Sequence, residues 1–249
     1  MTQAGAVRQS QEDKRVGEPQ KPWWWTLLVQ LVAYAGLVAL ACIPGSGNTT
    51  SATFSFTAFA VAVMLVLFEF FSPLRDLAAG RVIAVVLGLC AMVAASTPFV
   101  GTLVFEVAGR DHDLSGAAVV CAGWLAAAAT LLTVLVVGGF LRQMLRRDRP
   151  DMIVQMGHMD LDGVAAVCAS GWCFLPVMFH EASAPDAARM AVLAAVAVVA
   201  VLLAWVGRQW VSDARPLDGA RCTWIGFGLL SVMLTGGAVG VAALVMWLV

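Results

Sequence analysis

Long apolar runs, about seven in number and separated by short polar connections, constrain the fold of this sequence more than any other feature. Each run holds about the 20 residues that an α-helix needs to cross the hydrocarbon core of a bilayer. A helix is the form such a run can take in lipid, because its backbone polar groups must be satisfied within the segment. The runs cover residues 23–43, 52–71, 82–106, 114–141, 161–179, 187–210 and 222–249.

The composition agrees with a chain that lies mostly in lipid. Its mean hydropathy is +0.86 and only 12% of its residues are charged, whereas about a quarter are charged in an ordinary soluble domain. We therefore predict an all-α polytopic membrane protein, a bundle of about seven transmembrane helices formed as a single domain by residues 23–249. The polar residues 1–22 predict a disordered tail, and the first run predicts an uncleaved anchor. No basic domain remains outside the membrane to bind nucleic acid.

The basic residues predict the orientation. If the N-terminal tail is cytoplasmic, Arg110 and Arg189 are the only two of the 15 basic residues that lie on the outer side. Such a bias is what the positive-inside rule describes. We therefore expect a cytoplasmic N-terminus and an external C-terminus. The preference for arginine over lysine and the abundance of alanine and valine suggest a bacterium with a GC-rich genome, which places the chain in the plasma (inner) membrane.

Tryptophans mark the same boundaries. Indole rings favour the membrane–water interface, where an apolar ring and a polar N–H are both accommodated. Trp247 falls at the expected outer interface. The residues expected at the cytoplasmic interface are Trp23, Trp24, Trp25, Trp205, Trp210 and Trp224.

Prolines interrupt two of the runs. Pro98 predicts a kink in the third helix, because proline lacks an N–H and clashes with the preceding turn. The hydroxyls of the neighbouring Ser96 and Thr97 are expected to satisfy the freed backbone groups. Pro176, together with a polar flank, makes 161–179 the shortest and least regular of the expected helices.

The longest cytoplasmic loop is predicted at residues 142–160. It carries a cluster of basic residues and three methionines that share one helical face. This pattern favours an amphipathic helix lying on the membrane surface, with a soft-metal site for copper(I) as the alternative. We expect the loop to dock a cytoplasmic or membrane protein partner through Arg142, Arg146, Arg147, Arg149, Met152, Met156 and Met159.

Glu69 is the carboxylate deepest in an apolar run. A charge in such a place is expensive, so an ion or proton site is the functional interpretation. The alternative is that Glu69 reaches the nearby interface, or pairs there with Arg75 or Arg142.

The remaining features indicate packing more than chemistry. Gly236 and Gly240 have the small-xxx-small spacing of close helix contacts, within the fold or with another subunit. The six cysteines fit no disulfide or zinc pattern and are expected to be free. A metal or proton site between residues 111–113 and 180–181 is the weaker interpretation of those acids and histidines. We expect no metal and no cofactor, since the spans lack lysine and closely spaced histidines.

These features predict a transport-related component, either a small permease or the membrane subunit of a larger complex. A structural or assembly subunit without transport is the alternative. A third interpretation is a membrane enzyme at the cytoplasmic lipid interface, for which Glu69, Asp160 and Asp162 are the available acids; we lean against an enzyme.

Overall fold

The computed structural model describes seven stretches of the chain, and within them almost every residue is helical and none is in a strand. The predicted all-α class is confirmed for these residues. The expected tail at 1–22 and the site at 111–113 lie outside them. The described ranges are 23–43, 56–72, 78–108, 116–145, 152–180, 185–213 and 222–248.

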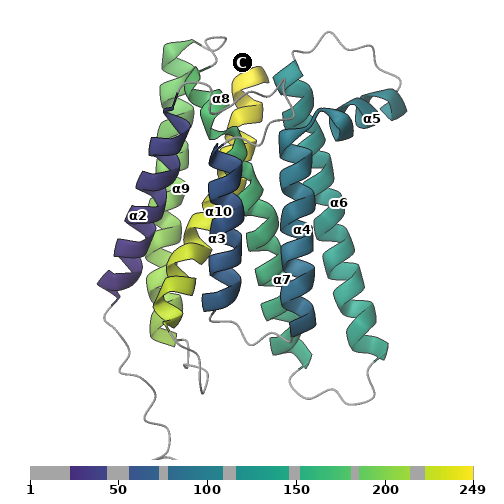
Figure 1. The fold of residues 1–249 in the computed structure, drawn as a ribbon, viewed down its shortest axis with the longest axis vertical. Coiled ribbons are helices and arrows are strands. Elements are labelled where there is room, and N and C mark those ends of the chain that lie inside the picture. Colours follow the sequence, from purple (N-terminus) through teal and green to yellow (C-terminus); the bar gives the residue numbers. More distant parts are fainter. Residues whose placement is uncertain are drawn as a thin grey trace, which may run out of the picture.

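The long helices lie side by side along one axis, and successive ones run in alternating directions (Figure 1). We call the end at which α2 begins the lower end; the marked C-terminus lies at the upper end. Consequently α4 and α7 run in the same direction, from the lower end to the upper. The long helices are α2 (Trp24–Ala41), α3 (Phe56–Phe71), α4 (Ala78–Ser96), α6 (Gly116–Leu145), α7 (Met152–Ala169), α9 (Asp186–Asp213) and α10 (Thr223–Leu248).

Five helical segments of the described chain are long and apolar enough to cross a membrane, and a bent pair makes up to six. The five are Trp24–Ala41, Gly116–Arg142, Met156–Phe179, Asp186–Trp210 and Thr223–Trp247. Helix α3 has 16 residues, or about 24 Å at the usual rise, which is shorter than the roughly 30 Å hydrocarbon core. The length and composition of the five longer segments are compatible with an integral membrane protein.

The predicted third helix is broken rather than kinked. Helix α4 ends at Ser96, and α5 (Phe99–Ala108) turns away by 77° to lie across the upper end of the bundle (Figure 1). The hydroxyl of Thr97 donates to the Val93 carbonyl over 2.9 Å, so the expected role of a neighbouring hydroxyl is confirmed there. The Pro98 carbonyl accepts the Thr102 N–H at 2.8 Å and so starts the new helix.

The predicted loop at 142–160 is wrong. Helix α6 continues to Leu145, and α7 begins at Met152 instead of at residue 161. Polar residues in the first turns of α7 lower the local hydropathy, but Asp162 among them is buried within the bundle. The helical path continues through the 3₁₀ turn η1 (Ser170–Phe174) into α8 (Leu175–His180), where Pro176 occupies the first turn, a position that tolerates proline.

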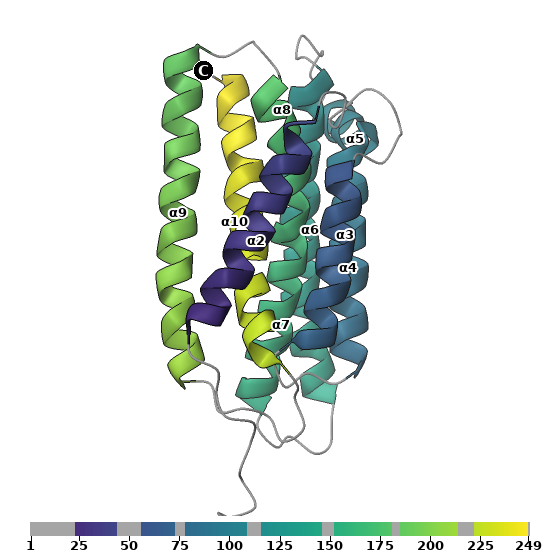
Figure 2. The same cartoon turned by 60° about the vertical axis from the view of Figure 1, so that its left-hand side comes forward.

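Helix α7 lies at the centre of the bundle and α9 at its edge (Figure 2). In the most apolar stretch of the α7–η1–α8 segment 83% of residues are buried, against 6% for α9. The central segment packs against α3, α4, α6 and α10, whereas α9 packs chiefly on α10. Side chains on the central segment are therefore shielded from lipid, and polar groups there meet other helices.

Candidate functional site

Asp162 is the fully buried carboxylate of the described chain. Its side chain is 0% exposed and lies on α7 inside the candidate span Met156–Phe179. Ser72, directly after α3, donates its hydroxyl to Asp162 Oδ1 over 3.4 Å. Burying an ionised carboxylate is costly unless neighbouring groups compensate it or it takes up a proton. The site therefore suits a group that exchanges a proton or holds a cation.

The register of α4 on α7 sets Arg81 at the level of the first turns of α7. Helices α4 and α7 run in parallel, and a Cβ on Gly88 would lie 3.2 Å from the Cβ of Ala166. Two helical turns toward the lower end, the same register sets Arg81 opposite the turn of α7 that contains Met159 and Asp162. The Nε of Arg81 is buried and has no hydrogen-bond partner among the described residues.

Asp160 faces the other side of α7. Its Oδ1 is buried without a hydrogen-bond partner among the described residues, and it would lie 3.6 Å from a Cβ on Gly139 of α6. Asp160 and Asp162 therefore point to different neighbours, because residues two apart lie on opposite sides of a helix. The first turns of α7 present one carboxylate to α6 and one to α3.

Glu69 lies on α3, three residues before Ser72 in the sequence, and its side chain is half-buried. Both of its carboxylate oxygens are shielded from solvent. The structure thus brings the predicted ion or proton candidate to the end of α3 that also contacts Asp162. We call the group at this end of the bundle the polar cluster; it consists of Glu69, Ser72, Arg81, Arg142, Asp160 and Asp162.

Some of the predicted docking residues lie on α6 and α7, and the others lie outside the described residues. Met159 is only 4% exposed, and its sulfur accepts a long contact of 4.0 Å from Arg142 Nη1. The interfacial-helix interpretation is wrong for Met159, because this residue packs into the bundle, and its burial does not fit a docking role. Met156 is half-buried. Arg146, Arg147, Arg149 and the side chain of Met152 lie outside the described residues.

The turn η1 interrupts the central helix at mid-bundle. Ser170 donates to the Val167 carbonyl at 2.6 Å and accepts the indole N–H of Trp124 at 2.7 Å. Trp172 donates its indole N–H to the carbonyl of Val232 on α10 at 2.9 Å. These bonds satisfy buried polar groups where the regular α-helical pattern stops. Specific side-chain contacts therefore stabilise the 3₁₀ turn.

A second hydrogen-bond chain crosses from α2 to α10. The hydroxyls of Tyr34 and Thr235 lie 2.8 Å apart, and Thr235 donates to the Ser231 carbonyl at 2.8 Å. The Tyr34 ring also packs on Trp172, with ring centroids 5.8 Å apart. Helices α2, α10 and η1 are thus joined by polar contacts at one level of the bundle.

The two predicted packing glycines lie at close contacts inside the bundle. A Cβ on Gly236 would meet the Cys168 carbonyl and approach Trp172 Cδ1 to 2.7 Å. A Cβ on Gly240 would run into the Trp124 ring. Both glycines therefore serve contacts between α10 and its neighbours within this chain.

Metal chemistry has little support in the described part of the chain. No three His, Cys, Asp or Glu residues converge there on a point that could hold a metal ion. No disulfide joins the described cysteines, and Cys121 and Cys173 are buried. Of the alternative metal site at 180–181, residue 181 and the side chain of residue 180 lie outside the described part of the chain.

Sequence reasoning missed the burial of Asp162 and the partnership of Ser170 with Trp124. The available signal was the helical spacing of polar residues from 155 to 162, which resembles a loop only when hydropathy is averaged along the chain. Comparison with protein-family models, with curated proteins and with solved structures finds no match to this chain.

Proposed function

We propose that this chain is a transport-related membrane protein, a small permease or the membrane subunit of a larger complex, in which proton exchange at Asp162 accompanies transport. The observation that carries the proposal is the complete burial of Asp162 on the most enclosed candidate span. An ionisable residue inside a membrane span is by default a candidate for an ion or substrate pathway. The shielded carboxylates of Glu69 and Asp160 supply further proton acceptors at the same end.

The proposal includes seven crossings, with the N-terminus in the cytoplasm and the C-terminus outside a bacterial plasma membrane. The alternating directions of the long helices support it, with α3 as a short crossing (Figure 1). Arg81, Arg142 and Arg208 occur at the lower ends of their helices, and Arg189 at the upper end. The lower end is then the cytoplasmic one by the positive-inside rule.

A flux assay tests the transport class. Purified protein is reconstituted into vesicles that contain a trapped pH-sensitive dye, and a potassium gradient with valinomycin sets the membrane potential. The proposal expects a dye response faster than that of empty vesicles and abolished by heat inactivation of the protein. Equal rates in protein-containing and empty vesicles would show that the protein does not move protons, and would contradict the proposal.

The connection between α6 and α7 is the proposed docking element. It carries Arg146, Arg147 and Arg149 between two helices that contribute to the polar cluster. A partner bound there would therefore contact the helix that carries Asp162. Reversal of the three charges to glutamate is expected to abolish co-purification of a partner in mild detergent, whereas R189E, at the opposite end, keeps it. Retention of the partner by the triple variant would end the docking proposal.

A structural or assembly subunit is the second candidate. The observation that favours it is the exposed apolar surface of α9, which packs chiefly on α10 and has only 6% of the residues of its most apolar stretch buried. That surface is suited to a second membrane protein as well as to lipid. A stable complex that co-purifies with the chain, together with vesicles that show no flux, would favour this candidate over transport.

A further inference from the structure

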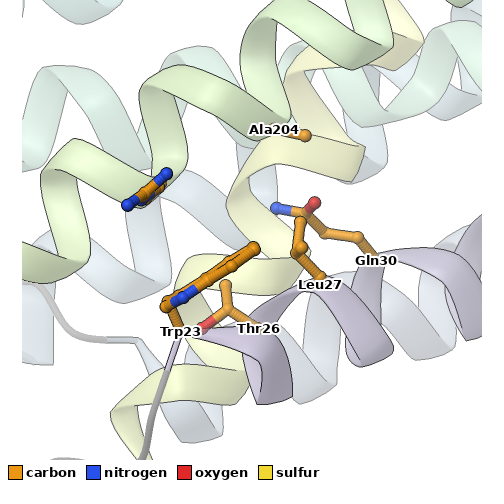
Figure 3. Close-up of a pocket in the computed structure, with 6 residues that line it drawn as sticks. Trp23, Thr26, Leu27, Gln30 and Ala204 are labelled. Carbon is orange, nitrogen blue, oxygen red and sulfur yellow. The ribbon is translucent and has the colours of Figure 1, made fainter.

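A small pocket lies between α2 and α9 at the lower end, away from the polar cluster (Figure 3). Positions 23, 26, 27 and 30 share one face of α2, since they follow the i, i+3, i+4, i+7 spacing. Ala204 and Arg208, one turn apart, line the pocket from α9. A Cβ on the neighbouring Gly207 would lie 3.6 Å from the Gln30 amide nitrogen, an ordinary contact, and 2.8 Å from Ser231 Oγ.

Two of the side chains that line this pocket, Gln30 and Thr26, are polar and buried. Gln30 is 3% exposed and Thr26 is 4% exposed. Neither Gln30 Nε2 nor Thr26 Oγ1 has a hydrogen-bond partner among the described residues. Helical side chains lean toward the N-terminus of their helix, so the Gln30 amide reaches back toward Thr26 and Trp23 (Figure 3). Leaving a buried donor unsatisfied is unfavourable, and a ligand that supplies an acceptor removes that cost.

The mouth of the pocket is positive. The guanidinium carbon of Arg208 lies 5.0 Å from the ring centroid of Trp23, a cation–π contact that holds an otherwise mobile side chain in place. None of the described residues that line the pocket is acidic. The lining therefore offers an amide donor, a hydroxyl and a guanidinium, which together suit an anion rich in oxygen acceptors.

The pocket lies where candidate spans start and end. The span Trp24–Ala41 begins beside it, and Asp186–Trp210 ends beside it. Stacked Trp24 and Trp25, with ring centroids 4.3 Å apart, and Trp224, 5.5 Å from Trp25, form an aromatic group at the same end. Tryptophan and arginine at helix ends mark the level of lipid headgroups. A ligand at this depth is most readily supplied by the bilayer itself.

We infer that this pocket binds the headgroup of an anionic phospholipid. The phosphate contacts Arg208 at the mouth beside the Trp23 ring, and one headgroup oxygen enters toward Gln30 and Thr26. The cavity volume is about 10 Å³, which accommodates a single water-sized group and excludes a whole phosphate. A lipid meets this requirement, since one oxygen is inserted and its chains remain in the membrane. Basic pockets between helices near the cytoplasmic interface are typical sites for such headgroups.

A ligand titration tests the site in purified full-length protein in neutral detergent. The ligands are short-chain phosphatidylglycerol, short-chain phosphatidylcholine with the same chains, and inorganic phosphate. The readout is the thermal unfolding midpoint, which rises with occupancy when a ligand binds the folded state. Phosphatidylglycerol should raise the midpoint saturably, and phosphatidylcholine and inorganic phosphate should leave it near the ligand-free value.

Matched variants assign the effect to this pocket. R208Q should weaken the apparent affinity for phosphatidylglycerol at least about tenfold, because a charge-assisted contact is lost. Q30L should also weaken it, without lowering the ligand-free midpoint, because it replaces an unsatisfied amide by an apolar group. R189Q removes a charge from the other end of the same helix and should bind as the unaltered chain does.

Three results would overturn the inference. Equal loss in R208Q and R189Q would indicate a general charge effect. An equal response to phosphatidylcholine would show that the pocket does not select an anionic headgroup. A response to inorganic phosphate as strong as that to the lipid would identify a free anion as the ligand instead.

Discussion

Replacing Gly171 by alanine is expected to separate α10 from the central helix. A Cβ at this position would meet the carbonyl oxygen of Gly236, lie 2.7 Å from its carbonyl carbon and lie 3.2 Å from the amide nitrogen of Gly240. All three atoms belong to backbone, so no side-chain rotation can relieve the contact. The two helices must move apart, and the indole bond from Trp172 to Val232 must lengthen with them.

The expected cost follows from comparison with Gly138 on α6. A Cβ on Gly138 would meet nothing within 4 Å, so G138A changes helix propensity with no clash. G138A gains up to about 1 kcal/mol of α-helix propensity, and G171A, in the 3₁₀ turn η1, gains no more than that. Overpacking, for which about 1–3 kcal/mol is usual, applies to G171A alone. We expect G171A to be less stable than G138A by at least this overpacking term.

Equilibrium unfolding of the two variants in mixed micelles, followed by tryptophan fluorescence, measures this difference. G138A should match or slightly exceed the unaltered chain in free energy of unfolding, and G171A should fall below it. If G171A proves as stable as G138A, the close approach of η1 to α10 is not the packing of the folded protein.

Two further substitutions test the polar contacts at mid-bundle by the same unfolding measurement. S170A leaves the buried indole N–H of Trp124 without its acceptor at 2.7 Å and should cost about 1–3 kcal/mol; a cost near zero would contradict the contact. Y34F keeps the ring that packs on Trp172 and removes the hydroxyl bonded to Thr235, so a smaller loss of about 0.5–1.5 kcal/mol is expected, and a loss as large as that of S170A would argue against it.

The elements that could be predicted are those that hydropathy alone determines. Helices α2, α6, α9 and α10 follow from continuous apolar runs, and their ends agree with the sequence to within a few residues. The break at Pro98 was predicted as a kink. Proline indicates where an α-helix is interrupted, but it does not determine the angle between the helices on either side. Packing of α5 on α6, where Gly123 approaches the Gly101 Cα, supports the 77° turn.

The first turns of α7 could not be predicted in the same way. Averaged hydropathy treats His158, Asp160 and Asp162 as a polar stretch, although a helix distributes them over faces that meet different neighbours. Whether such a stretch is a loop or a buried polar helix depends on residues far away in sequence, such as Ser72. The same limit applies to Gln30, whose unsatisfied amide is recognised only when α9 is placed beside α2.

The central claim is that Asp162 exchanges protons in a transport protein, and a paired flux measurement tests it most directly. D162N and D186N remove the same charge from a buried site and from an exposed one, since the Asp186 side chain is 88% exposed. In dye-loaded vesicles with equal amounts of protein, we predict that D162N lowers the rate to that of empty vesicles while D186N retains it. Equal rates for D162N, D186N and the unaltered chain would contradict the claim.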